Sequence, residues 1–251
     1  MLGDSHGALF GQGCLQPGMI KATYGTGSSV MMNIGEKPIF SDTGVVTSLA
    51  WKIGGRVNYV LEGNINYTGA VITWLKDDVH LISSPGETEA LALAANPADT
   101  ACLVPAFSGL GAPYWRSEAR ALLCGMTRTT GRNEIVRAAL NCIALQIADI
   151  VKAMARGAGT PVRELRVDGG PTRNGYLMQF QSDLLDIPVR IPEAEELSGI
   201  GAAYAAGLSA GLYDSSVFDR LGRRAYMPAM SEADREKAFR IWQDAIRMVC
   251  G

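Results

Sequence analysis

A strand that leads through two glycines into a helix constrains the fold of this chain more than any other feature. The stretch covers residues 164–175 and reads E-L-R-V-D-G-G-P-T-R-N-G. The alternation of Leu165 and Val167 predicts a short strand that ends on Asp168. Apolar residues at helical spacing then predict a helix over residues 173–185.

The two glycines of this turn are candidates for ligand contact. Gly169 and Gly170 carry no side chain, so a flat ligand can lie directly on the main chain. The start of the next helix offers free N–H groups and a positive dipole end, which suits a nucleotide. The alternative is a plain tight turn with Asp168 as the helix cap, and this stretch alone favours neither interpretation.

A second glycine cluster lies where a phosphate group could be held. Residues 19–33 read M-I-K-A-T-Y-G-T-G-S-S-V-M-M-N, and two predicted strands flank the turn Gly25-Thr26-Gly27. Such a hairpin presents backbone N–H groups and a hydroxyl to an anion. Taken alone, it is also an ordinary β-turn.

Five sequence blocks in a fixed order resemble the C-terminal half of the FGGY family of carbohydrate kinases, closest to the glycerol kinases of that family. They span residues 3–212 and read G-D-S-H-G-A-L-F-G-Q-G-C, T-Y-G-T-G, V-P-A-F-S-G-L-G-A-P-Y-W, V-D-G-G-P-T-R-N-G-Y-L-M-Q-F-Q-S-D and G-I-G-A-A-Y-A-A-G. Several blocks in order are more specific than any single motif. The resemblance implies an α/β fold, a ribonuclease-H-like (actin/hexokinase-type) ATPase domain with a mixed sheet and flanking helices.

The resemblance also implies a domain organisation. Residues 1–15 are expected to form a hinge segment with the catalytic-aspartate motif, and residues 16–251 the C-terminal nucleotide-binding domain. We expect an N-terminal kinase lobe as the partner, because the family's first domain carries most sugar contacts; a homo-oligomer is a further option. The alternatives are a non-catalytic nucleotide- or sugar-binding module, or an inactive isolated lobe.

The family's chemistry is phosphoryl transfer from ATP with Mg2+, and the resemblance assigns its site residues. Asp4 stands at the catalytic base, which accepts the proton of the attacking substrate hydroxyl and faces magnesium through water. The alternative for Asp4 is a turn or cap aspartate. Ser5 and Ser29 stand at substrate positions. The nucleotide-binding positions are Gly25, Thr26, Gly27, Gly69 and Thr73 near the phosphates and Gly169, Gly170 and Asn174 near the adenine.

Four residues depart from the pattern of the glycerol kinases. Ser5 replaces a glutamine that bonds a terminal hydroxyl, and Ser29 replaces an aromatic wall. Both changes enlarge the pocket, so a longer polyol or a sugar becomes a candidate substrate. Thr73 replaces a glutamine near the phosphates, and Asn141 replaces an acidic residue or glutamine in a long helix.

Composition excludes several other functions. A net charge of −2 gives no reason to expect nucleic acid or an anionic membrane as a partner. The five cysteines form no C-x-x-C pair and are expected to be reduced thiols, and two histidines do not make a zinc site. No apolar run approaches the ~20 residues that span a bilayer, so we expect a cytoplasmic protein. The sequence contains no G-x-x-x-x-G-K-[ST] motif.

The remaining hydrophobic patterns predict further strands and helices in an alternating order. Small residues around Gly201 predict a close contact between their helix and the sheet. Residues 220–230 are expected to form an extended connector with a solvated basic cluster. Strands are predicted over residues 20–24, 29–32, 46–51, 57–61, 102–104, 121–124 and 189–191, and helices over residues 68–79, 133–155, 197–212 and 232–249.

Overall fold

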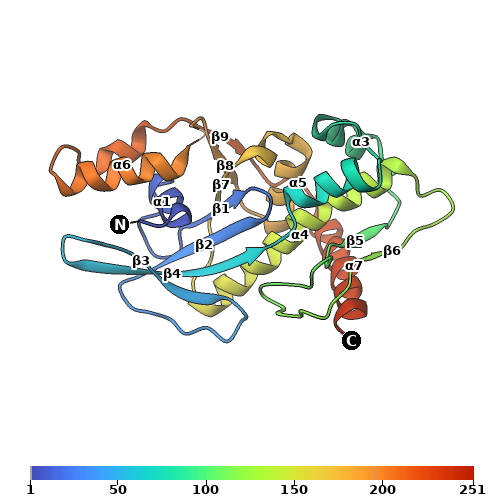
Figure 1. Cartoon of the computed structure of the whole chain (residues 1–251), viewed down its shortest axis with the longest axis horizontal. Helices are drawn as coiled ribbons and strands as arrows, with labels where there is room; N and C mark the ends of the chain where they lie inside the picture. The colour runs from blue at the N-terminus through green and yellow to red at the C-terminus, as the bar shows by residue number, and fades with distance from the viewer. Residues whose placement is uncertain (1, 195) are drawn as a thin grey trace.

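A mixed sheet of seven strands runs through the computed structural model, which describes residues 2–194 and 196–251. Its strand order is β3-β4-β2-β1-β7-β8-β9 (Figure 1). The strands are β1 (Ile20–Tyr24), β2 (Ser28–Gly35), β3 (Val46–Ile53), β4 (Arg56–Ile65), β7 (Leu165–Asp168), β8 (Val189–Pro192) and β9 (Arg223–Tyr226). The expected fold class, α/β with a mixed sheet, is confirmed.

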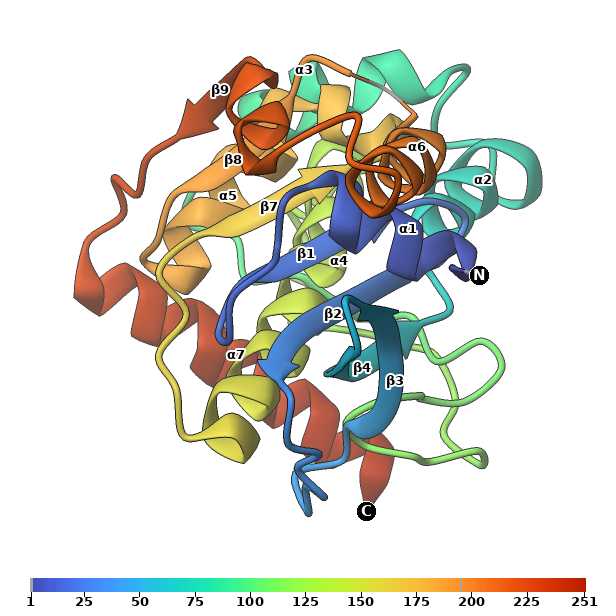
Figure 2. The same ribbon diagram turned by 90° about the vertical axis from the view of Figure 1, so that its left-hand side faces the viewer.

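Helices cover both faces of the sheet, with α1 and α6 on one face and α4 on the other (Figure 2). A separate two-stranded sheet, β5 (Cys102–Val104) with β6 (Leu122–Cys124), lies beside α7. The helices are α1 (Asp4–Gly11), α2 (Gly69–Thr73), α3 (Thr88–Ala94), α4 (Arg132–Ala158), α5 (Gly175–Leu185), α6 (Leu197–Ser209) and α7 (Glu232–Cys250).

The central strand β1 determines where the two glycine turns lie. It pairs with β2 in antiparallel and with β7 in parallel, and Thr23 stands opposite Asp168 in the parallel pair. Because parallel strands end at the same edge of a sheet, the turn after Tyr24 and the turn after Asp168 emerge side by side. Two motifs more than a hundred residues apart in sequence therefore meet at one edge.

Helix α4 is the centre of the hydrophobic core. Its 27 residues have a window of mean hydropathy 1.5, long and apolar enough to cross a bilayer, so the expectation of no such apolar run is wrong. However, 83% of that window is buried inside the protein. The buried Asp149 of α4 accepts hydrogen bonds from Trp242 of α7 (2.5 Å) and Tyr114 (2.6 Å). Those contacts tie α7 to the core.

The helix expected over 68–79 is present over residues 69–78, as α2 followed directly by one π-helical turn, Trp74–Asp78. Two other sequence expectations about local structure are wrong. Gly201 packs against helix α1 and not against the sheet, because a Cβ there would overlap the Gly7 carbonyl oxygen. The stretch 220–230 contains the edge strand β9, which pairs with β8.

The basic cluster of that stretch is also more than a solvated surface. Arg223 donates to the carbonyl oxygen of Gln12 (3.0 Å), and Arg224 donates to the carbonyl oxygen of Thr172 (3.0 Å). These bonds connect the last strand to α1 and to the turn after β7.

The five cysteines are free thiols, as expected, but two of them lie opposite each other. Cys102 and Cys124 are directly paired in register across β5 and β6. Burial raises the pKa of Cys102 to about 12 and also raises the pKa of Cys124.

Candidate nucleotide site

A cavity of about 560 Å³ opens next to the edge where the two glycine turns meet. Four of the predicted nucleotide-binding residues line it: Gly69, Thr73, Gly170 and Asn174. Its other walls come from Ile72, Pro85, Gly86, Thr88, Glu89, Leu140, Ile143, Pro171, Arg173 and Leu177. The lining is thus largely apolar with a few polar groups, the usual character of a small-molecule site.

The turn Gly25-Thr26-Gly27 offers the donors that an anion needs. The Gly25 N–H donates to the Gly27 carbonyl oxygen at 2.8 Å, which closes the turn. Among the described residues, the N–H groups of Thr26 and Gly27 and the Thr26 hydroxyl make no hydrogen bond. Since Thr26 is exposed, these donors face outward from the sheet edge.

The same turn is fastened to the start of α2. The N–H groups of Thr68 and Ala70 donate to the Thr26 carbonyl oxygen, and that of Gly69 donates to the Gly25 carbonyl oxygen, at 2.9–3.0 Å. A Cβ on Gly69 would lie 2.8 Å from that Gly25 oxygen, so only glycine permits the contact. These amides are therefore already used in hydrogen bonds to the turn.

Gly169 and Gly170 have different roles. Gly169 has φ +98°, and a Cβ there would overlap the Tyr24 carbonyl oxygen of the neighbouring strand. Gly169 is thus required for the backbone conformation of the turn and for its close approach to β1. A Cβ on Gly170 would meet no atom within 4 Å, and Gly170 lines the cavity, so its surface is free for a ligand.

Asn174 is both a helix cap and a wall of the cavity. Its Oδ1 accepts a hydrogen bond from the Leu177 N–H (2.9 Å) at the start of α5. Its Nδ2 donates to the Thr88 hydroxyl (3.0 Å). One N–H of the side-chain amide remains for a ligand, because Nδ2 carries two hydrogens.

Sequence reasoning missed the wall that lies between residues 85 and 89. It includes Pro85, Gly86, Thr88 and Glu89 at the start of α3. The available signal was a capping box, in which Glu87 accepts a hydrogen bond from the Ser84 N–H at 2.9 Å. Glu89 also accepts a bond from the Gly175 N–H (3.2 Å), which joins α3 to α5.

The predicted substrate-side residues do not line this cavity. Asp4 is exposed in the first turn of α1, and Ser5 follows it, half-buried. Ser29 lies on β2, where its Oγ is buried and has no hydrogen-bond partner among the described residues. Ser29 stands opposite Thr23 of β1.

A buried lysine, which sequence reasoning also missed, lies between these two groups of residues. Lys21 on β1 is fully buried and donates to the Thr23 hydroxyl at 2.8 Å. Burial lowers the pKa of Lys21 to about 8, while the nearby carboxylates of Asp168 and, more weakly, Asp4 favour its charged form. Asp168 itself accepts a hydrogen bond from Gln12 (3.0 Å). The sequence signal for this residue was a lysine between two apolar residues of a predicted strand.

A family comparison accounts for this arrangement. Residues 20–210, most of the chain, match the FGGY family of carbohydrate kinases, C-terminal domain. The chain belongs to the FGGY family. This match covers both glycine turns and all the helices that line the cavity.

The curated relatives of this FGGY chain include several glycerol kinases. The glycerol kinase of Halorhodospira halophila is 45% identical over 247 residues, which is 98% of this chain and 49% of that protein. Glycerol kinase 1 of Thermotoga maritima is 47% identical over 250 residues, 98% of this chain and 51% of that protein. The FGGY chain thus spans about half the length of the curated relatives it matches.

Solved structures of carbohydrate kinases superpose on this chain. A crystal structure of Plasmodium falciparum glycerol kinase with ADP superposes with a TM-score of 0.91 at 35% identity, over 98% of this chain and 50% of that one. A xylulose kinase from Lactobacillus acidophilus superposes with a TM-score of 0.83 at 19% identity, over 97% of this chain and 49% of that one. The second likeness shows the fold alone.

Proposed function

We propose that this FGGY chain is the nucleotide-binding lobe of a kinase that transfers phosphate from ATP to a hydroxyl of a polyol or sugar. The observation that carries the proposal is that two glycine turns meet beside a cavity whose lining includes Gly170, a residue at which an added Cβ would meet no other protein atom within 4 Å. The ADP in the structure of the Plasmodium relative supports a nucleotide as the ligand.

We assign a role to each of the predicted nucleotide-binding residues. The adenine lies over Gly170 near the remaining Asn174 N–H, and the free donors of Thr26 and Gly27 hold the outer phosphates. Thr73, the last residue of α2, lines the same cavity. Gly25, Gly69 and Gly169 keep the backbones close enough for this geometry.

Asp4 is the proposed catalytic base, because an exposed carboxylate is free to accept the proton of a substrate hydroxyl. Magnesium would neutralise charge on the phosphates. The described residues contain no cluster of three metal-ligating side chains. A single carboxylate still fits, since Mg2+ keeps several waters and takes much of its coordination from phosphate oxygens. Asp4 would therefore hold the ion through water.

The substrate is proposed to be longer than glycerol. Ser5 and Ser29 are shorter than the glutamine and aromatic residue of the glycerol kinase pattern, which leaves room for a polyol or sugar of four or more carbons. Glycerol itself remains the alternative, since the curated relatives are glycerol kinases. We place the protein in the cytoplasm, with an N-terminal kinase lobe as its partner.

Nucleotide binding tests the first half of the proposal. Titration of the folded chain with ADP in a calorimeter should give saturable heat, weaker than in a complete kinase because the second lobe is absent. Gly170→Trp should abolish that heat by filling the cavity. The matched control is Gly199→Trp on the exposed side of α6, where a Cβ meets only the flexible Glu196 side chain. Absence of heat at millimolar ADP contradicts the proposal.

Turnover tests the second half and separates a kinase from a binding module. The chain alone should show no phosphoryl transfer, whereas a protein with both lobes should reach about 1–100 turnovers per second. Asp4→Asn in that protein should remove turnover and leave ADP binding unchanged. Binding without turnover in the two-lobed protein would establish the binding module instead.

Substrate choice is tested by Ser5→Gln with Ser29→Phe in the two-lobed protein. The ratio of kcat/KM values for glycerol over a longer polyol should rise about tenfold, which corresponds to about 1.4 kcal/mol. A parent protein that already prefers glycerol would refute the interpretation of these serines and leave the kinase proposal intact.

A further inference from the structure

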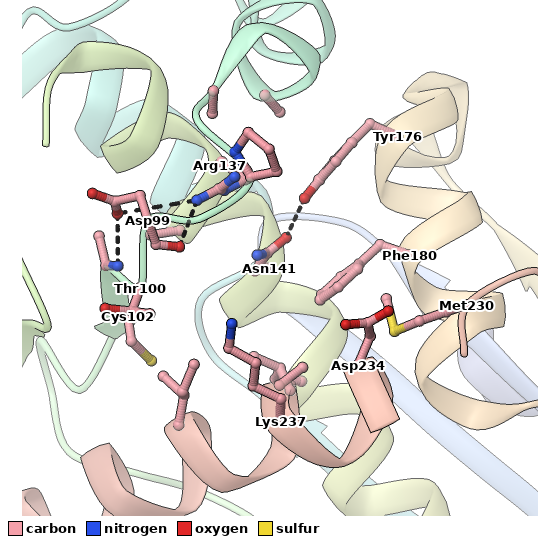
Figure 3. Close-up of a pocket in the computed structure, with 18 of the residues that line it drawn as sticks. Asp99, Thr100, Cys102, Arg137, Asn141, Tyr176, Phe180, Met230, Asp234 and Lys237 are labelled. Carbon is pink, nitrogen blue, oxygen red and sulfur yellow. Dashed lines mark hydrogen bonds and ion pairs between the residues drawn. The ribbon is translucent and has the colours of Figure 1, made fainter. Parts of the chain in front are cut away.

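The structure contains a second cavity, of about 510 Å³ (Figure 3). Its walls come from α3, α4, α5 and α7 and from the strand β5. The two cavities share no lining residue. On α4, Leu140 and Ile143 face the nucleotide cavity, whereas Arg137 and Asn141 face this one.

Unpaired hydrogen-bond donors converge on this space. Lys237 of α7 is an exposed residue with no hydrogen-bond or ion-pair partner among the described residues, and Figure 3 shows its ammonium group pointing into the cavity from the rim. Asn141 of α4 lies across from it. Its Oδ1 accepts a hydrogen bond from the Tyr176 hydroxyl at 2.8 Å, which orients the amide, and its Nδ2 hydrogens have no acceptor among the described residues.

The acidic groups around the cavity already have partners. Asp99 accepts hydrogen bonds from the Thr130 hydroxyl (2.6 Å) and the Ala101 N–H (2.8 Å). Arg137 donates to the carbonyl oxygens of Asn96 (2.7 Å) and Asp99 (2.9 Å), so its guanidinium is held in place beside the Asp99 carboxylate. Asp234 accepts a hydrogen bond from Ser231 (2.7 Å). Of the charged side chains that line the cavity, Lys237 is therefore the one without a protein partner among the described residues.

The other wall of the cavity is apolar. Phe180 of α5 is buried and presents its ring to the space, and Leu145, Met230 and Ile241 also line the cavity. Removing these surfaces from water favours a ligand with an apolar body.

We propose that this second cavity binds a small organic anion, whose carboxylate or phosphate group is held by Lys237 and Asn141 and whose apolar body lies against Phe180. The proposal does not depend on the kinase assignment, because it rests on residues outside the nucleotide cavity. Charge-assisted hydrogen bonds from an ammonium group and an oriented amide supply the affinity for the anion.

The test uses phenyl phosphate and benzoate as probes, titrated into the folded chain and followed by calorimetry and amide chemical shifts. Both anions should bind with a dissociation constant of about 1 mM, and neutral benzyl alcohol should bind more weakly. Lys237→Gln should weaken anion binding about fivefold to tenfold. Asn141→Asp keeps the acceptor for Tyr176 and replaces the amide donor with a negative charge, so it should remove anion binding.

The controls separate this cavity from other sites. Arg240→Gln on the same helix removes one positive charge outside the cavity and should leave the affinity unchanged. Gly170→Trp blocks the nucleotide cavity and should also leave it unchanged, even for phenyl phosphate. The proposal is overturned if neither probe saturates by about 20 mM, if Lys237→Gln and Asn141→Asp bind as the parent does, or if Gly170→Trp abolishes binding.

Discussion

The buried lysine of β1 should make stability rise with pH in a way that one substitution removes. Lys21 has a pKa of about 8 in the folded chain, against 10.5 for an ordinary lysine in water. Between these two values the unfolded chain binds the proton that the folded chain has lost. The free energy of unfolding must therefore increase with pH in this window, because the unfolded chain binds more protons there than the folded chain does. Below about pH 8 both states are protonated and the term is constant.

The magnitude follows from the two values. Going from about pH 7 to about pH 9.5, a folded pKa of about 8 and an unfolded pKa of about 10.5 give roughly 2 kcal/mol of added stability. The total curve also contains opposing contributions, since burial raises the pKa of Cys14 and Cys102 to about 12. Unfolded thiols lose their protons first, which lowers stability above about pH 8.5. Only the difference between two variants isolates the lysine.

The assay is urea unfolding of the parent and Lys21→Met at both pH values. Methionine keeps most of the side-chain volume and loses both the titration and the hydrogen bond to Thr23. The free energy of unfolding of the parent minus that of the variant should increase by about 2 kcal/mol between the two pH values. Lys37→Met, at an exposed position, should give a difference that does not change with pH. A flat difference for Lys21→Met as well would refute the argument from burial.

Three more predictions concern backbone, packing and thiols. Gly169→Ala should lower the free energy of unfolding by about 3 kcal/mol or more, because its φ is positive and its Cβ overlaps Tyr24, whereas Gly170→Ala should change it by less than about 1 kcal/mol in the same urea titration. Trp242→Phe should cost about 2–3 kcal/mol by thermal or urea unfolding, because the buried Asp149 loses a donor; an unchanged midpoint would show that water replaces it. At about pH 8 the buried Cys14 and Cys102 should resist iodoacetamide until urea unfolds the chain, which mass spectrometry of the labelled peptides can check.

Local patterns predicted the fold well wherever a segment is stabilised by its own neighbours in sequence. The strands β1, β5 and β7 and the long helix α4 lie where apolar periodicity placed them, with ends shifted by a few residues. The strand that turns on Asp168 was also predicted correctly, because its alternation and its paired glycines are both local signals.

The errors occur where a distant segment decides the outcome. β9 is a strand only because it has β8 to pair with, and its own basic sequence gives no apolar alternation. The small residues around Gly201 indicated close packing correctly, but the sequence did not show that α1 was the partner. Short α3 has no long periodic face and was missed, although a capping box marks the 3-10 turn directly before it, Pro85–Glu87.

The candidate site was predicted as a set of positions more successfully than as a set of roles. The glycines were predicted to be ligand contacts, yet only Gly170 has open space where a side chain would be. Gly69 faces the carbonyl oxygen of Gly25, and Gly169 faces that of Tyr24. A glycine in a sequence reports that a side chain does not fit. Whether a ligand or another backbone excludes the side chain depends on the parallel pairing of β1 and β7, which sequence motifs alone do not contain.

The same pairing explains why a lysine is tolerated at the centre of the sheet. Lys21 lies opposite Arg166 of β7, and the Asp168 carboxylate ends that neighbouring strand two residues later. The carboxylate and the Thr23 hydroxyl give the buried ammonium group a charge and an acceptor, although burial still lowers its pKa. A strand that only had to fill the core would carry an aliphatic residue at this position, since a buried ion pair seldom stabilises more than well-packed apolar groups. Lys21 lies in the strand that leads to the proposed phosphate-binding turn. A bound anion favours a positive charge near this turn, whereas a stable core favours an aliphatic side chain.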